Sequence, residues 1–242
     1  MSTSINPKEI EHFSKDSARW WDEGGPFAIL HRLNPVRLRY VRDQIGQHYG
    51  LAEGDLKAFK GLKILDIGCG GGLVCEPLAR LGADVTGIDA DGQAVRVARE
   101  HAEKSGLDIQ YIEGSAESCK GKFDVVTALE IVEHVNDVET FVKSAAGLCK
   151  PGGLVIFSTL NRTPQSFLLG IVAAEHILRW VPRGTHDWKK FVRPSELAAA
   201  LRAGGMTPGD ITGYGFDVRT GEFRLTNKDI AVNYFMCAEK KK

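Results

Sequence analysis

The feature that most constrains the fold is an apolar run that closes on an acid and then on a cluster of glycines, Ile64-Leu65-Asp66-Ile67-Gly68-Cys69-Gly70-Gly71-Gly72. Such a run is typical of a buried strand that leads into a tight turn, where glycines let the backbone approach a ligand without an intervening Cβ. A second apolar run, about 20 residues further on, ends on Asp89. An acid at the tip of the neighbouring parallel strand can accept hydrogen bonds from both hydroxyls of a ribose. The two signals together predict a site for a cofactor that carries a ribose.

Details of the turn discriminate between two classes of cofactor. A dinucleotide fingerprint requires G-x-G-x-x-G, but Leu73 occupies the position of the last glycine. Asp66, directly before the turn, would face two phosphates at short range, which disfavours a dinucleotide. S-adenosylmethionine carries a sulfonium and an ammonium and has no phosphate, so its charges suit a turn built from Asp66, Gly68 and Gly70. The turn therefore predicts S-adenosylmethionine, with a nicotinamide-dependent reductase as the less favoured alternative.

Composition limits the partners that we expect. The 242 residues include 31 Lys and Arg and 31 Asp and Glu, so the formal net charge is zero and no overall basic field attracts nucleic acid. The five cysteines are widely spaced, without a CxxC pair, which indicates a reducing compartment and no structural zinc. The first residues lack the apolar core of a secretory signal. We therefore expect a bacterial-type cytoplasmic protein that does not bind nucleic acid.

Apolar runs alternate with helical patterns from residue 62 onward, which is typical of a parallel sheet covered by helices on both faces. The predicted strands are 63–67, 84–88, 109–113, 123–129 and 154–159, separated by segments that include predicted helices over 95–104 and 138–148. Two further runs, 211–217 and 230–238, predict an antiparallel pair at the edge. The fold class is thus α/β: a Rossmann-like, doubly wound, mostly parallel seven-stranded sheet with an antiparallel edge strand. Ligands of such sheets bind outside the carboxyl ends of the strands.

The chain is expected to divide into an N-terminal helical segment, residues 1–60, that covers the cofactor cleft, and a catalytic domain, residues 61–242, with a lid helix inserted near 162–192. Within the first segment, Asn34 followed by Pro35 predicts the start of a helix. Arg37 would then lie one turn into that helix and offer a planar fork to the carboxylate of the methionine moiety. The alternative for Arg37 is a solvated surface arginine, since other arginines lie nearby.

Several of these motifs resemble the class I S-adenosylmethionine-dependent methyltransferases: 64–72, Asp89, 123–135 and 150–153. More restrictive motifs resemble the ubiquinone-biosynthesis O-methyltransferase family, namely 19–22, 30–37, 157–162 and 182–191, and the resemblance covers nearly the whole chain. It implies methyl transfer to a hydroxyl of a polyprenylated phenol or catechol, at both O-methylation steps of quinone assembly, including 3-demethylubiquinol to ubiquinol. It also implies that the cofactor is contacted by Arg37, Gly68, Asp89 and Leu129.

A phenol, with a pKa of about 10 by analogy with tyrosine, must lose its proton to a base or with the help of a metal ion. Glu130, Glu133 and His134 follow the strand that ends at Leu129, and their spacing places all three on one face if the chain turns helical there. They would then hold a divalent ion of the magnesium type, with manganese or iron as alternatives. Without a metal, Glu133 and His134 remain candidates for the catalytic residues. His186 is a competing base, whose alternative role is to stabilise a turn.

The segment 166–181 is strongly apolar but too short and too charged to span a bilayer. It is expected to be a lid over the substrate pocket that also lies in the membrane interface. Lipid would be contacted by Phe167, Leu168, Ile171, Val172 and Trp180, and anionic headgroups by Arg179, Arg183, Lys189 and Lys190. We thus expect peripheral contact with the inner membrane, and other quinone-biosynthesis enzymes as partners. Two alternatives stay open: a methyltransferase of another small aromatic compound, and a non-catalytic cofactor-binding scaffold.

Overall fold

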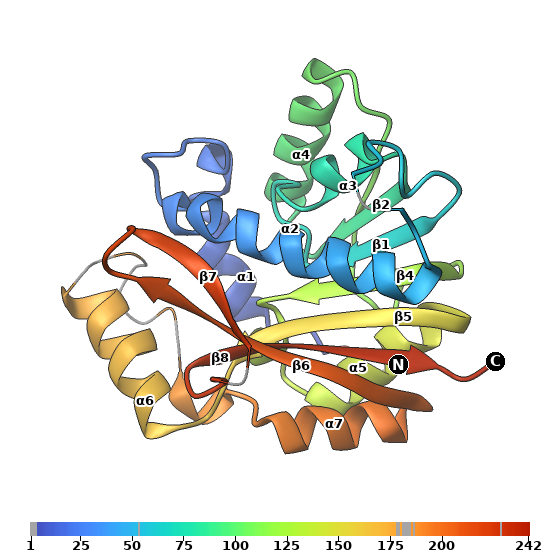
Figure 1. Cartoon of the computed structure of the whole chain (residues 1–242). Helices are drawn as coiled ribbons and strands as arrows, with labels where there is room; N and C mark the ends of the chain where they lie inside the picture. Colours follow the sequence, from blue (N-terminus) through green and yellow to red (C-terminus); the bar gives the residue numbers. More distant parts are fainter. Residues whose placement is uncertain (1–3, 53, 178–179, 181–184, 186, 228) are drawn as a thin grey trace.

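The computed structural model describes residues 4–52, 54–177, 180, 185, 187–227 and 229–242. A mixed eight-stranded sheet forms the centre, with the strand order β3-β2-β1-β4-β5-β8-β6-β7 (Figure 1). Neighbouring strands from β3 to β5 pair in parallel, whereas β8 is antiparallel to β5 and β6, and β7 is antiparallel to β6. The strands are β1 (Lys63–Ile67), β2 (Asp84–Asp89), β3 (Gln110–Glu113), β4 (Phe123–Leu129), β5 (Cys149–Leu160), β6 (Met206–Asp217), β7 (Glu222–Asn227) and β8 (Asn233–Lys240).

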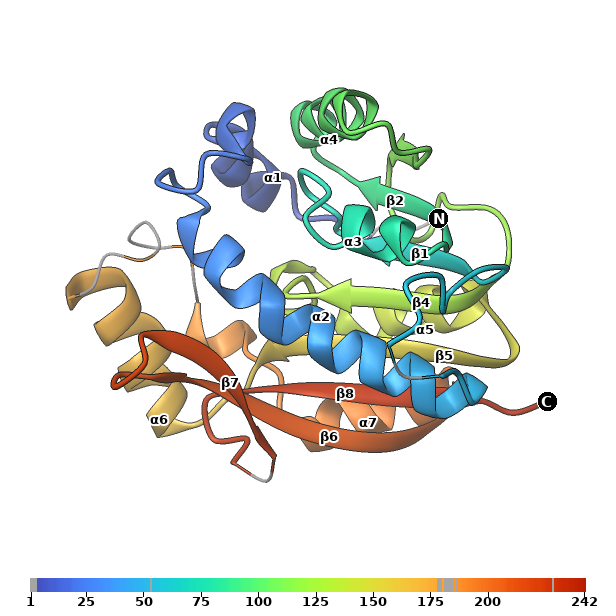
Figure 2. The same cartoon turned by 45° about the horizontal axis from the view of Figure 1, so that its top comes forward.

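Helices cover both faces of this sheet (Figures 1 and 2). The α-helices are α1 (Pro7–Ser14), α2 (Ala28–Tyr49), α3 (Cys75–Arg80), α4 (Gly92–Lys104), α5 (Val138–Leu148), α6 (Pro164–Ser166) and α7 (Pro194–Ala203). Short 3₁₀ turns are η1 (Ser17–Arg19), η2 (Val132–His134) and η4 (Trp188–Lys190), and a π-helix, η3 (Phe167–Ile177), continues α6. Apolar side chains of α2, α3 and α4 form the core on one face, and those of α5 and α7 form the core on the other.

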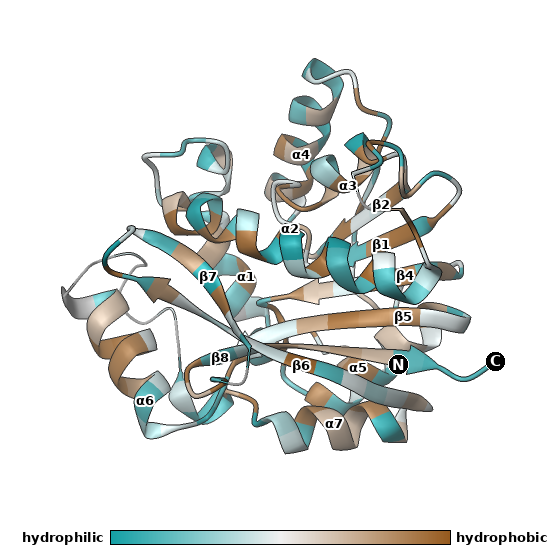
Figure 3. Cartoon of the chain, in the orientation of Figure 1, coloured by the Kyte–Doolittle hydropathy of each residue, from teal (hydrophilic) through white to brown (hydrophobic). Residues whose placement is uncertain are grey.

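The apolar strands supply both cores because successive side chains of a strand point to opposite faces. In β5, Leu154 and Ile156 belong to the core under α2, while Val155 and Phe157 belong to the core under α5 and α7. Brown segments along the central strands in Figure 3 show this concentration of apolar residues. The prediction of an α/β fold with strands buried on both faces is confirmed, and all five cysteines are free thiols.

The sheet differs from the prediction in having eight strands rather than seven. The predicted pair of C-terminal strands forms between β6 and β8, but β8 lies inside the sheet and β7 occupies the edge. β7 escaped prediction because it alternates half-buried Phe223 and Leu225 with exposed Glu222 and Arg224 and contains no continuous apolar run. The turn at Gly221 (φ 75°) allows it to fold back on β6.

The predicted helix start at Asn34-Pro35 is wrong, because α2 begins at Ala28 and Pro35 lies within it. Asn34 does not cap the helix; its side-chain amide donates a hydrogen bond to the carbonyl oxygen of Leu73 (2.7 Å). Leu33 and Val36 are buried on either side of this contact. Packing of the first turns of α2 therefore outweighs the local signal for a helix start.

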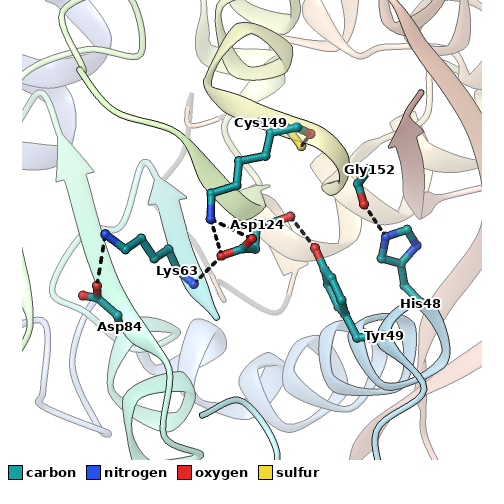
Figure 4. Close-up of polar contacts among 8 residues, drawn as sticks. His48, Tyr49, Lys63, Asp84, Asp124, Cys149 and Gly152 are labelled. Carbon is teal, nitrogen blue, oxygen red and sulfur yellow. Dashed lines mark hydrogen bonds and ion pairs between the residues drawn. The ribbon is translucent and has the colours of Figure 1, made fainter. Parts of the chain in front are cut away.

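A cluster of polar contacts ties together the amino ends of the central strands (Figure 4). The Asp124 carboxylate accepts hydrogen bonds from the Lys63 backbone N–H (2.8 Å) and from Lys150 Nζ (2.8 Å). The hydroxyl of Tyr49, at the end of α2, donates to the carbonyl oxygen of Asp124 (2.9 Å). His48 Nε2 lies 2.9 Å from the carbonyl oxygen of Gly152. These contacts fix β1, β4, β5 and α2 at the end opposite the carboxyl ends of the parallel strands.

Candidate active site

A cavity of about 750 Å³ lies at the carboxyl ends of the parallel strands, within the range of small-molecule sites. Residues of the N-terminal segment, of the loops that follow β1, β2 and β4, of η3 and of the β6–β7 hairpin line it. The cavity brings together every described residue that the sequence analysis singled out as a site residue: Arg37, Asp66, Gly68, Gly70, Asp89, Leu129, Glu130, Glu133 and His134. His186, together with Arg179 and Arg183, lies outside the described residues.

The turn after β1 depends on glycine. Gly68 (φ 73°) and Gly70 (φ 52°) both adopt left-handed backbone conformations. The Gly68 N–H donates to the carbonyl oxygen of Ile88 (2.8 Å), and the Gly70 N–H donates to Asp89 Oδ2 (2.8 Å), so the turn is fastened to the end of β2. A Cβ on Gly70 would lie 2.5 Å from Trp20 Cη2. A side chain at this position would therefore displace the indole that covers the turn.

Asp89 ends β2 and presents its carboxylate to the cavity. Its two oxygens accept hydrogen bonds from the backbone N–H groups of Gly70 and Asp91, at 2.8 Å each. Burial raises the pKa of Asp89, and these backbone hydrogen bonds oppose the shift. Each carboxylate oxygen retains a second lone pair, so the group can also accept from the two hydroxyls of a ribose.

Arg37 and Asp66 are two further charged residues that line the cavity. Arg37 is only 5% exposed, and its Nε and Nη2 atoms have no hydrogen-bond partner in the described part of the chain. Asp66 accepts a hydrogen bond from Thr127 Oγ1 (2.6 Å), and burial raises its pKa to about 6. Because buried guanidinium nitrogens without partners are costly, Arg37 is suited to an anionic ligand group. The pair fits the carboxylate and the ammonium of the methionine moiety of S-adenosylmethionine.

Trp20 and Trp21 cover the glycine turn from the N-terminal segment. The indole of Trp20 stacks on Phe27 with ring centroids 3.9 Å apart, and its buried Nε1 has no partner among the described residues. Trp21 Nε1 donates to the carbonyl oxygen of Gly71 (3.0 Å). No local sequence pattern predicts this contact, since the two residues lie about fifty positions before the turn. Its position above the turn is a feature of the tertiary structure.

Glu130 and Glu133 are engaged by polar groups of the sheet. Glu130 Oε1 accepts hydrogen bonds from the hydroxyls of Tyr214 (2.5 Å) and Ser158 (2.6 Å). Its backbone is in the left-handed region (φ 55°), which is uncommon for a residue with a side chain. Glu133 Oε2 accepts a hydrogen bond from Thr159 Oγ1 (2.7 Å). Burial raises the pKa of Glu133, and the nearby charge of Glu130 raises it further. Tyr214 is thus a lining residue that the sequence analysis missed.

His134 is held by a residue far away in the sequence. Its Nδ1 lies 3.1 Å from Glu9 Oε2 in α1, while Glu9 Oε1 pairs with Lys190 Nζ (2.7 Å). Burial lowers the pKa of His134, but the hydrogen bond with Glu9 and the neighbouring carboxylates outweigh this effect and raise the pKa. The same hydrogen bond lowers the pKa of Glu9 to about 2. No local pattern in the sequence connects Glu9 to this site.

The prediction that Glu130, Glu133 and His134 share one helical face is wrong. Only Val132–His134 form a 3₁₀ turn, and the left-handed backbone of Glu130 turns its side chain toward Tyr214 and Ser158. The three side chains consequently have different partners on β6, β5 and α1. Within the ranges that the structure describes, no three His, Cys, Asp or Glu side chains converge as metal ligands. A metal site at these three residues is therefore not supported by the arrangement and stays a prediction.

Comparison with known proteins identifies the family. A family model described as "Methyltransferase domain" matches residues 65–157, which run from β1 to β5. A ubiquinone biosynthesis O-methyltransferase of Maricaulis maris is 50% identical over 98% of this chain and 94% of its own length. A protein of the same name from Methylobacterium sp. (strain 4-46) is 47% identical over 98% of this chain and 96% of its own length. The chain belongs to the ubiquinone biosynthesis O-methyltransferase family. It is therefore an S-adenosylmethionine-dependent O-methyltransferase, which confirms the cofactor that the turn predicted and the activity that the resemblance implied.

Solved structures that resemble this O-methyltransferase support its fold. A methyltransferase of Thermotoga maritima, named as a possible histamine N-methyltransferase, has a TM-score of 0.63 and 19% identity, covering 97% of this chain and 99% of that one. The magnesium protoporphyrin IX methyltransferase of Synechocystis with bound S-adenosylhomocysteine has a TM-score of 0.59 and 20% identity, covering 85% and 83%. Both likenesses confirm the Rossmann-like architecture of S-adenosylmethionine-dependent methyltransferases.

Proposed function

We propose that this O-methyltransferase methylates a phenolic or catechol hydroxyl of a polyprenylated ubiquinone precursor, at both O-methylation steps, including 3-demethylubiquinol to ubiquinol. The observation that carries the proposal is the single cavity that joins the cofactor residues to His134 and then to an apolar outer region. The names of relatives that are 46–50% identical over nearly the whole chain support the assignment of the pathway.

The residues of the cavity suggest how the cofactor is held. The buried fork of Arg37 would bind the methionine carboxylate, and Asp66 would pair with the ammonium group. Asp89 would accept from the ribose hydroxyls, while Leu129, buried at the end of β4, would pack against the adenine. The left-handed turn at Gly68 and Gly70 would let the backbone approach the ligand closely. The segment 1–60 would form the roof of this site through its aromatic residues.

Bound S-adenosylmethionine would supply an electrophilic methyl group, whose transfer would form a C–O bond on the acceptor while the C–S bond breaks and its electron pair returns to sulfur. His134 lines the cavity and would accept the phenolic proton, and the Glu9 carboxylate at its Nδ1 would stabilise the resulting imidazolium. Holding the acceptor and the methyl group in line contributes further, since well-oriented reactions gain roughly 7–11 kcal/mol.

The reaction can be tested with purified protein, labelled S-adenosylmethionine and a demethylated quinol that carries a short isoprenoid tail. We expect methylated product, and His134→Gln should lower kcat about 100-fold or more while leaving the affinity for S-adenosylmethionine unchanged. A chelator arm belongs in the same assay. Product lost with chelator and restored by magnesium would require Glu130, Glu133 and His134 to leave their observed partners and converge. Cofactor binding without product on any quinol would favour the scaffold or another aromatic substrate.

We further propose that η3 touches membrane lipid. Its first residues, Phe167, Leu168 and Leu169, are 48%, 58% and 51% exposed, although all are large and apolar. Trp180, which was also predicted to contact lipid, is half-buried and packs against Phe216, so we do not include it in this exposed patch. Among the described helices, none has both the length and the apolar character required to cross a bilayer.

Liposome flotation tests the lipid contact. Serine substitutions at Phe167, Leu168 and Leu169 should reduce binding to anionic vesicles about tenfold, since each removes exposed apolar surface that would enter the interface. Leu56→Ser is the matched control, because Leu56 is 79% exposed and lies on a different surface loop, outside the lining of the cavity. Equal flotation of the triple variant and the wild type would contradict the proposal that η3 contacts membrane lipid.

A further inference from the structure

The cavity extends well beyond the cofactor and His134. Its outer part lies between η3, which continues the helix labelled α6, and the β6–β7 hairpin, which lie side by side at one edge of the molecule (Figures 1 and 2). We call the apolar residues of this part the outer wall: Leu160, Leu169, Ala173, Trp180, Phe216 and Phe223. The mouth is close to the hairpin turn, where Val218 lines the cavity and is 84% exposed.

Three aromatic rings form the centre of the outer wall. Trp180 meets Phe216 and Phe223 edge to face, with ring centroids 4.8 and 6.0 Å apart, and the two phenyl rings meet each other at 5.4 Å. The guanidinium of Arg32 lies over Trp180 (5.4 Å) and Phe216 (5.1 Å), and Arg32 Nη2 donates to the carbonyl oxygen of Gly221 (2.7 Å). These contacts fasten the hairpin to α2. The contacts of Arg32 therefore hold the aromatic residues of the outer wall in place, even though β7 is an edge strand.

Polarity changes along the cavity. The inner end presents the carboxylates of Glu130 and Glu133, the imidazole of His134 and the hydroxyl of Tyr214, whereas the outer wall presents hydrocarbon and aromatic rings. Arg224, Thr226 and Asp229, on β7 and the loop after it, also line the cavity. Arg224 pairs with Asp217 (3.3 Å), the Thr226 hydroxyl donates to the carbonyl oxygen of Asp229 (2.6 Å), and the Asp229 carboxylate accepts from the Ala231 N–H (3.2 Å). A ligand that matches this gradient has a polar, hydroxylated ring at one end and a hydrocarbon chain at the other, because apolar surface gains free energy by leaving water.

We propose that the outer wall is the binding site for the first isoprene units of the acceptor's polyprenyl tail, with β7 and Trp180 as specificity-determining elements. The inference rests on the proposed function for the identity of the tail. It assigns a role to β7, the edge strand that was not predicted, since Phe223 of β7 completes the aromatic cluster. It also orients the acceptor, with the ring inward at His134 and the tail outward along the outer wall toward exposed Val218.

The test compares a blocked cavity with a matched control on the same helix. Ala173→Phe places a ring in the outer part, whereas Val172→Phe adds the same ring at a neighbouring position that is not among the described lining residues. For each protein, kcat/KM is measured with a demethylated quinol that carries a farnesyl tail and with one that carries none. In the wild type and in Val172→Phe we expect the tail to raise kcat/KM at least about tenfold, and in Ala173→Phe this ratio should fall toward one.

Binding of farnesol, measured by calorimetry, provides a readout that requires no turnover. The wild type should bind this tail without a ring, and Ala173→Phe should weaken its binding about tenfold, with the affinity for S-adenosylmethionine as the check that the variant is folded. An equal tail preference in the wild type and in Ala173→Phe, or farnesol binding unchanged by that substitution, would overturn the inference while leaving the proposed function intact. Farnesol binding that is lost in Ala173→Phe, without methylation of any quinol by the wild type, would keep the tail site and overturn the proposed function.

Discussion

Asp66 is a buried carboxyl group whose pKa burial raises from 3.8 to about 6, so it is protonated in the free protein below about pH 6. A cationic ligand favours the ionised form, and the affinity for S-adenosylmethionine should therefore rise with pH through this range. We expect the Kd at about pH 5 to be about tenfold higher than above pH 7, because protonation then competes with binding. Isothermal titration calorimetry across this range measures the effect.

Asp66→Asn separates this effect from that of Asp89, whose pKa is also raised by burial. The variant should bind S-adenosylmethionine more weakly at neutral pH and lose most of the pH dependence of the Kd. The stability of the ligand-free protein should depend on pH in the opposite direction to cofactor affinity. Because the pKa of Asp66 is higher in the folded state than in the unfolded state, its contribution to the free energy of unfolding is present below about pH 4 and is lost as pH rises through about 6. A Kd independent of pH in the wild type would contradict the assignment of Asp66 to the cation.

The N-terminal segment covers the glycine turn, and Trp21 links this segment to the rest of the protein. Trp21 stacks on His101 with ring centroids 3.5 Å apart and donates to the carbonyl oxygen of Gly71 (3.0 Å). Trp21→Ala should release the segment for part of the time, and the apparent affinity falls with the fraction of docked molecules. We expect faster hydrogen exchange in α1 and a Kd for S-adenosylmethionine raised about 5- to 10-fold. Faster exchange with an unchanged Kd, relative to Leu56→Ala as control, would show that the roof does not contribute to cofactor binding.

At the scale of the whole molecule, the polar contacts around Asp124 (Figure 4) lie at the amino ends of the strands. The cavity lies at their carboxyl ends, so these contacts are separate from the site. Asp124→Ala removes acceptors from Lys63 N–H and Lys150, and should lower the free energy of unfolding by about 1–3 kcal/mol. The affinity for S-adenosylmethionine should not change. Asp84→Ala is the control: its contact with Lys63 is long (3.9 Å) and exposed, so less than about 0.5 kcal/mol is expected in denaturant titrations. A large loss of cofactor affinity in Asp124→Ala would contradict this separation.

The sequence could predict which residues of the proposed cofactor site lie together, because these residues follow strands whose pattern is local. Asp66, Gly68 and Asp89 come directly at the ends of two apolar runs, and parallel strands bring those ends to one edge. The acceptor half was not predictable in the same way. Glu9 lies 125 residues from His134, and Tyr214 lies 84 residues from Glu130, so no local spacing reveals either contact. The prediction that Glu130, Glu133 and His134 share one helical face failed for the same reason, since partners on other elements decide where Glu130 and Glu133 point.

The sequence by itself determined the fold class, the cofactor and the carboxyl-end location of the site, because buried strands and glycine turns depend on side-chain pattern and backbone sterics within short segments. Only the tertiary structure decided where α2 starts, that β7 forms the edge strand, and that Trp20 and Trp21 cover the glycine turn. It also decided which residues contact the side chains of Glu130, Glu133 and His134. Each of these depends on contacts between segments far apart in the chain, where packing and the need to pair buried polar groups outweigh local preference.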